Sequence, residues 1–124
     1  MKRRLCIVDD DEMLSMMLED HLEVHDNLQI QSYPTGEDFL ADISNRPDFV
    51  ILDYNLDSIQ PEAKNGLEVL KDIMAFDDSI KVIMYSSEQQ EGEALKYIKA
   101  QTLDFIIKDN QAFSKIDQVI LKSA

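Results

Sequence analysis

The chain has 124 residues, of which 44% are hydrophobic and 30% are charged, a length and composition typical of one domain with a buried core. Its formal net charge of −13 excludes most nucleic-acid-binding and membrane-surface proteins, because both partners are negatively charged, and favours cations or basic partner surfaces. No apolar run reaches the length of a membrane span, and the run at residues 5–8 is too short for a signal peptide. We therefore expect a cytoplasmic protein with one domain, residues 1–124.

The hydrophobic pattern alternates between strand and helix along the chain. Short apolar runs predict strands, and apolar residues at helical spacing predict the helices that follow them. The predicted strands are residues 5–8, 28–33, 49–53, 81–85 and 104–107. The predicted helices have their apolar positions within residues 13–22, 35–43, 67–74, 94–98 and 113–120. This alternation predicts an α/β fold with a five-stranded parallel sheet and helices on both of its faces.

Two local features of the helices also lead to predictions. Methionine fills irregular gaps in protein cores, so the methionines of the first helix are predicted to be core residues rather than a methionine-rich binding face. These methionines are Met13, Met16 and Met17. Ser87 with Gln90 matches the pattern of a capping box, and it predicts the start of the fourth helix.

Four of the five predicted strands end on polar side chains that are capable of chemistry. These side chains are Asp9 and Asp10 after the first strand, Asp53 at the end of the third, Ser86 after the fourth and Lys108 after the fifth. The carboxyl ends of parallel strands lie on one edge of the sheet, where open α/β sheets place their active sites. A single acid at such a position is usually a helix cap, but the whole set predicts a site.

Three carboxylates at one edge would repel each other unless a cation joined them. Oxygen ligands without a complete protein cage suit Mg²⁺, which keeps several waters and prefers a phosphate partner. A carboxylate beside Mg²⁺ and a lysine can attack a phosphoryl group and form an aspartyl phosphate. The chain contains no glycine-rich phosphate loop, so a nucleotide-binding function is weakly supported.

This set of residues resembles the receiver domain of two-component response regulators, the CheY-like domain. The resemblance extends over essentially the whole chain and includes Pro47–Asp48 before the third strand and Asp104–Ile106 before Lys108. It implies a flavodoxin-like three-layer fold with strand order 2-1-3-4-5. It also implies that Asp53 accepts a phosphoryl group from a sensor histidine kinase or a histidine phosphotransfer protein.

The resemblance also implies roles for the neighbouring residues in a Mg²⁺-dependent reaction. Asp10 matches the direct Mg²⁺ ligand, Asp9 supports it, and Asn55 matches the position whose backbone carbonyl binds the ion. Asp53 would itself contribute to the metal site.

Three further positions match the phosphate-binding and switch residues of the family. Lys108 matches the lysine that pairs with the phosphoryl group, and Ser86 matches the hydroxyl that binds it. Phe105 matches the switch aromatic that packs inward when the hydroxyl is recruited, although a simple core role remains an alternative. A downstream protein of unknown identity would read the changed surface, so the domain would be a switch and not a turnover enzyme.

Two of the departures from the family pattern concern loops next to the predicted site. The loop from Asp53 to Gly66 is longer than usual, and it is either a tolerated insertion or a feature that shapes partner recognition. Asp109 stands where a proline normally follows the lysine, so we expect a trans bond there and an altered fifth-strand loop.

Two alternative functions remain open from the sequence. A degenerate receiver-like interaction module would not be phosphorylated, but such a module would be expected to lose Asp53 or Lys108. A small Mg²⁺-dependent phosphatase would need a second general acid or base near the nucleophile, and none is suitably placed. His21 and His25 are four residues apart and predict surface side chains rather than a transition-metal pair, because no third ligand is apparent.

Overall fold

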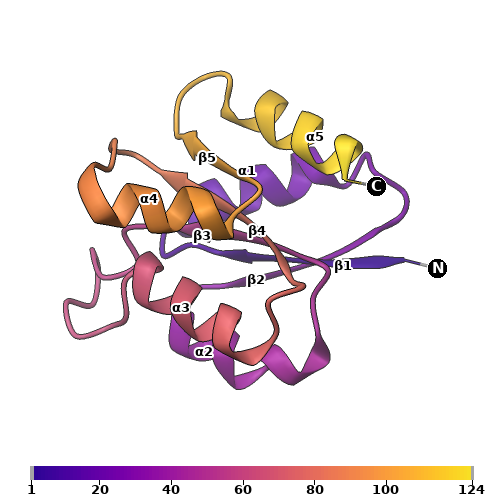
Figure 1. The fold of residues 1–124 in the computed structure, drawn as a ribbon. Coiled ribbons are helices and arrows are strands. Elements are labelled where there is room, and N and C mark those ends of the chain that lie inside the picture. Colours follow the sequence, from indigo (N-terminus) through magenta and orange to yellow (C-terminus); the bar gives the residue numbers. More distant parts are fainter. Residues whose placement is uncertain (1, 124) are drawn as a thin grey trace.

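Five parallel strands form the central layer of the computed structural model, which describes residues 2–123 (Figure 1). The strands are β1 (Arg3–Val8), β2 (Leu28–Tyr33), β3 (Phe49–Asp53), β4 (Lys81–Ser86) and β5 (Asp104–Ile107). Their order is β2-β1-β3-β4-β5, which confirms the predicted flavodoxin-like sheet. The register aligns the carboxyl ends of the inner strands, since Val8 pairs with Leu52 and Asp53 pairs with Tyr85.

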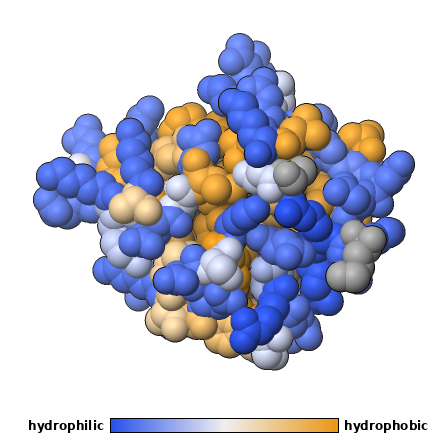
Figure 2. All heavy atoms as spheres, turned by 45° about the vertical axis from the view of Figure 1, so that its right-hand side comes forward, coloured by the Kyte–Doolittle hydropathy of each residue, from blue (hydrophilic) through white to orange (hydrophobic). Residues whose placement is uncertain are grey.

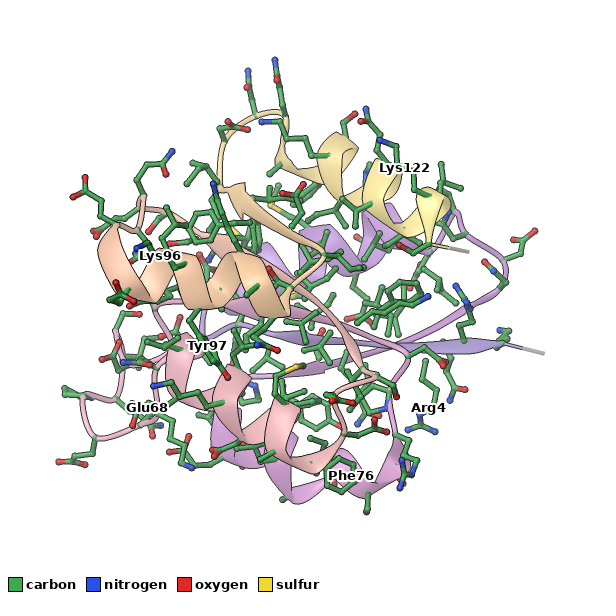
Figure 3. All side chains as sticks on the ribbon, viewed as in Figure 1. Arg4, Glu68, Phe76, Lys96, Tyr97 and Lys122 are labelled. Atoms are coloured by element: carbon green, nitrogen blue, oxygen red, sulfur yellow. The ribbon has the colours of Figure 1, made fainter. Side chains whose placement is uncertain are left out.

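Helices cover both faces of this sheet. They are α1 (Glu12–Leu22), α2 (Gly36–Ala41), a short 3₁₀ turn (Ile43–Asn45), α3 (Gly66–Phe76), α4 (Gly92–Gln101) and α5 (Ala112–Lys122). Helices α1 and α5 pack on one face, and α2, α3 and α4 pack on the other (Figure 1). Each face therefore has its own hydrophobic core. Tyr97 of α4 lies towards α3, where the Lys71 Nζ atom is 5.6 Å from the centre of its ring (Figure 3).

Strand β3 is the most deeply buried element of the sheet. All five of its residues, Phe49–Asp53, are buried, because helices cover both sides of this central strand. Strand β2 lies at the edge, and its alternating burial agrees with its alternating sequence. Side-chain caps then fix the helix starts: Asp11 accepts a hydrogen bond from the Leu14 amide, and Thr35 accepts one from the Asp38 amide.

The structure contradicts two of the local predictions. Met13, Met16 and Met17 are 74%, 67% and 54% exposed, so the prediction that they fill the core is wrong. Leu18 and Leu22 are the buried apolar residues of α1, and the methionines lie outside the face that these leucines present to the sheet.

The second wrong prediction is the capping box of α4. Helix α4 begins at Gly92, and its N-cap residue is Glu91, whose side chain makes no capping hydrogen bond. Gly92 has a φ of +66°, a conformation that favours glycine, so the chain turns into the helix here and not at Ser87.

The face of the molecule shown in Figure 2 is dominated by hydrophilic residues, with smaller hydrophobic areas between them. This distribution agrees with the net charge of −13. Within residues 2–123, none of the helices combines the length and the hydropathy that a membrane span requires.

Candidate functional site

Three carboxylates meet at the carboxyl edge of the sheet, as the sequence predicted. Oxygen atoms of Asp9, Asp10 and Asp53 all lie within 4.8 Å of one another. Asp9 and Asp53 are 3% and 2% exposed, and Asp10 is half-buried. The Asp11 amide donates to Asp9 Oδ1 at 2.9 Å, and the Asn55 amide donates to Asp53 Oδ1 at 3.1 Å. Backbone donors therefore orient the two buried carboxylates from the residues that follow each strand.

Lys108 places its ammonium group between these two buried carboxylates. Its Nζ atom is 3.1 Å from Asp9 Oδ2 and 3.2 Å from Asp53 Oδ1. The peptide bond before Asp109 is trans, as predicted, since residues 2–123 contain no cis bond. The Lys108 amide donates to the Ser86 carbonyl at 2.8 Å, which continues the pairing of β5 with β4. This pairing carries the side chain to the site without the proline that usually follows.

The electrostatics of the cluster centre on Asp53. Burial and, to a smaller extent, the charge of Asp9 raise the pKa of Asp53 to about 7, while Lys108 opposes both effects. Burial alone would lower the pKa of Lys108, but the carboxylates of Asp53 and Asp9 outweigh it and raise that pKa above 10.5. The lysine is therefore charged and is held between two acids that repel each other.

Tyr85 packs its ring against the end of the Lys108 side chain. The Lys108 Nζ atom is 4.9 Å from the centre of the Tyr85 ring, within the range of a cation–π interaction. Tyr85 is 2% exposed and lies one residue before Ser86 in β4. Sequence reasoning missed this contact, because an aromatic residue in a buried strand predicts only a core position.

We expect Tyr85→Leu to slow the phosphoryl transfer that the family resemblance implies for this site, because the ring helps to hold the Lys108 side chain. Loss of the ring frees the Lys108 side chain, and we expect phosphorylation by a small phosphodonor to slow roughly 5- to 10-fold. Tyr85→Phe keeps the ring and should react at nearly the wild-type rate. Equal loss in both variants, measured by intact mass against time, would assign the effect to the hydroxyl and contradict the cation–π interpretation.

The two residues predicted to act as the switch have other partners, and the Ser86 hydroxyl makes no hydrogen bond to Asp53 within the described part of the chain. The buried Ser86 Oγ donates to the Glu88 carbonyl at 2.8 Å and accepts from the Glu88 amide at 3.1 Å. Phe105 is half-buried and lines a hollow of about 430 Å³ between α4 and β5. The Ser86 hydroxyl is thus bonded to its own loop, and Phe105 has space beside it.

The residues at this edge fit a magnesium ion. The candidate ligands are all oxygens, which Mg²⁺ prefers, and two of the three carboxylates are almost fully buried. The side-chain Oδ1 of Asn55 is also buried, and it has no hydrogen-bond partner among the described residues. A buried polar atom without a partner is unfavourable, and a hydrated cation with its water shell would supply donors here. Asp9, Asp10, Asp53 and the Asn55 carbonyl would hold the ion.

The structure adds a second contact to the site that the sequence did not reveal. Ser58, in the long loop after β3, donates a hydrogen bond from Oγ to Asp10 Oδ2 at 2.5 Å. The only signal in the sequence was the unusual length of the loop, which does not indicate which residue faces the acids.

The two histidines have a shared partner elsewhere on the molecule. The Nε2 atoms of His21 and His25 lie 2.6 and 2.9 Å from different carboxylate oxygens of Asp117 on α5. Nothing in the sequence indicated that Asp117 lies beside the two histidines. Each imidazole is hydrogen-bonded to a different oxygen of this carboxylate. The arrangement is a pair of hydrogen bonds that join the end of α1 and the turn after it to α5.

An open parallel sheet of this order, with polar side chains gathered at its carboxyl edge, defines a flavodoxin-like α/β protein. The family model of the response regulator receiver domain matches residues 5–120, which is nearly the whole chain. The protein belongs to the receiver domains of two-component signalling.

Individual relatives agree with this family. The chain is 36% identical over 110 residues to the chemotaxis protein CheY of Listeria monocytogenes, covering 88% of each chain. It is 31% identical over 112 residues to the chemotaxis protein CheY of Thermotoga maritima, covering 90% of this chain and 89% of the relative. A CheY-like receiver domain structure from Methanospirillum hungatei matches with a TM-score of 0.82 at 20% identity, covering 98% of this chain and 94% of that one. The last similarity concerns the fold alone.

Proposed function

We propose that residues 1–124 act as one receiver domain that accepts a phosphoryl group on Asp53 in a Mg²⁺-dependent reaction. The donor would be a sensor histidine kinase or a histidine phosphotransfer protein. The observation that carries this proposal is the position of the Asp53 carboxylate, which lies among two further carboxylates and 3.2 Å from the Lys108 ammonium. Such a group of acids with one lysine is suited to phosphoryl transfer, which needs positioning and charge neutralisation.

The two oxygens of Asp53 have different environments. Oδ1 accepts the Asn55 amide at 3.1 Å and lies 3.2 Å from Lys108 Nζ, whereas no described residue donates to Oδ2. Oδ2 is therefore the better nucleophile. It would form the new O–P bond as the P–N bond to the donor histidine breaks, and the imidazole would leave with the electron pair of that bond.

The remaining residues of the site would neutralise the transferred group. Asp9, Asp10 and the Asn55 carbonyl would hold Mg²⁺, which supplies positive charge next to the phosphoryl oxygens when it is bound. Lys108 is already in place to meet another oxygen, and its raised pKa keeps it protonated.

The switch would then follow from a change of hydrogen-bond partner by Ser86. The Ser86 hydroxyl would leave the Glu88 backbone and donate to the phosphoryl group, and Phe105 would move into the space that is vacated. The surface of α4, β5 and α5 would change as a result. We propose that a downstream protein in the cytoplasm reads this surface, that the domain binds neither nucleic acid nor membrane, and that it turns over no separate substrate.

The proposal is tested by incubating the protein with Mg²⁺ and acetyl phosphate and then measuring its intact mass. We expect a gain of one phosphoryl group, no gain when EDTA removes Mg²⁺, and no gain in Asp53→Ala. Asp57→Ala removes a carboxylate from the following loop and serves as the matched control, which should react normally. A wild-type protein that folds but never gains the group would instead be a degenerate interaction module.

A further inference from the structure

The long loop after β3, residues 54–65, connects the carboxyl end of this strand to α3 (Figure 1), and hydrogen bonds fix its base and its returning half. The Gly66 amide donates to the Tyr54 carbonyl at 2.7 Å, which closes the loop at its base. A Cβ atom at Gly66 would come within 2.4 Å of the Asp53 carbonyl oxygen, so the closure requires glycine. The Lys64 amide donates to Glu37 of α2 at 3.0 Å, so the returning half of the loop is attached to a neighbouring helix.

Ser58, in the first half of this loop, contacts two of the groups that would hold the metal ion. Its hydroxyl donates to Asp10 Oδ2 at 2.5 Å, and its amide donates to the Asn55 carbonyl at 3.4 Å. The described residues offer Asp10 no other side-chain donor. Asp10 is also the most exposed of the three acids, so packing restricts its carboxylate less than it restricts those of Asp9 and Asp53.

We propose that Ser58 is a positioning residue for Mg²⁺ binding, because its hydroxyl holds the Asp10 carboxylate in the orientation that the ion requires. This inference rests on the proposed Mg²⁺ site of the receiver function. An ionised carboxylate has about four lone-pair positions, so Asp10 can keep the Ser58 hydrogen bond while its other oxygen faces the ion. Hydrogen-bond partners of metal ligands commonly contribute about 10- to 100-fold to metal affinity.

The hydroxyl also eases the repulsion within the acidic cluster. Asp10 lies within 4.8 Å of Asp9 and Asp53, and Lys108 contacts those two acids but not Asp10. The Ser58 hydroxyl is therefore the one side-chain donor that the described residues offer to Asp10. The added loop length thus has a chemical consequence at the site and is more than a tolerated insertion.

The test is a Mg²⁺ titration of the unphosphorylated protein followed by ¹H–¹⁵N NMR, which measures affinity without any phosphoryl transfer. We expect Ser58→Ala to raise the Mg²⁺ dissociation constant about 10-fold. Ser58→Thr keeps the hydroxyl and should restore most of the affinity. Gln60→Ala, a neutral change at an exposed position of the same loop, is the control and should bind as the wild type does.

The outcomes separate this inference from the proposed function. Unchanged or tighter binding in Ser58→Ala, with normal binding by the wild type, would overturn the positioning role and leave the Mg²⁺ site intact. A wild type with no saturable Mg²⁺ binding would overturn both the metal site and the role of Ser58. Thermal unfolding in EDTA should be unchanged in Ser58→Ala, because an exposed loop hydroxyl contributes little to the fold; a large loss would instead assign Ser58 a structural role and overturn the proposal.

Discussion

Lys108→Ala is expected to destabilise the protein by about 3 kcal/mol at pH 8 in the absence of Mg²⁺. The Lys108 ammonium is the positive group that contacts both Asp9 and Asp53, and these two carboxylates are 3% and 2% exposed. Removing one partner of a buried ion pair leaves the other charge unpaired in a low dielectric, which is far more unfavourable than the loss of a surface ion pair. The expected loss should shrink near pH 5, because Asp53 then accepts a proton.

Urea denaturation with EDTA, repeated with saturating Mg²⁺, measures this effect. The metal ion should recover part of the loss, since it restores positive charge beside the same acids. Lys96→Ala is the matched control: Lys96 pairs with Glu93 while their side chains are 77% and 92% exposed, and we expect almost no change. Equal midpoints for Lys108→Ala and Lys96→Ala would show that the buried acids need no counter-charge.

Much of this site could be predicted because sheet topology converts strand ends into neighbours. Apolar runs followed by Asp9, Asp53 and Lys108 were enough to place these residues on one edge, and the structure brings them within ion-pair distance. The fold could also be predicted, since residues 49–52 form a continuous apolar run that is typical of a strand covered on both faces.

The remaining features depend on packing and loop geometry that composition does not encode. In the sequence, the methionines of α1 cannot be distinguished from core residues. They are exposed because α1 presents Leu18 and Leu22, and not the methionines, to the sheet. The start of α4 depends on the backbone conformation of Gly92 rather than on a serine with the spacing of a cap. The contact of Ser58 with Asp10 depends on the path of an irregular loop, for which no periodicity exists.

Asp53→Asn is expected to stabilise the metal-free protein, increasingly so as the pH rises. Burial and the charge of Asp9 raise the pKa of Asp53 from 3.8 to about 7, so ionising this carboxyl is harder in the folded state than in the unfolded state. Below pH 4 the Asp53 carboxyl is protonated in both states, and the folded state keeps its full stability. As the pH rises from about 4 to about 7, the unfolded chain loses this proton more readily than the folded chain, and the free energy of unfolding falls. The interval from 3.8 to about 7 sets an upper figure of about 4 kcal/mol for that loss.

The neutral amide introduced by Asp53→Asn would not suffer this loss, although it would form a weaker bond with Lys108. We therefore expect equal stability of the two proteins near pH 4 and an advantage of about 2–3 kcal/mol for Asp53→Asn at pH 8. Denaturation with EDTA across this pH range measures the difference.

Asp57→Asn, which makes the same charge change in the loop after β3, should follow the wild type. A wild-type curve that runs parallel to that of Asp53→Asn would mean that Asp53 ionises as readily in the folded chain as in the unfolded one. If the expected divergence is found, Asp53, the proposed nucleophile, is held at a cost to the stability of the fold. Mg²⁺ should then reduce the gap, because it would stabilise the ionised form of this carboxyl.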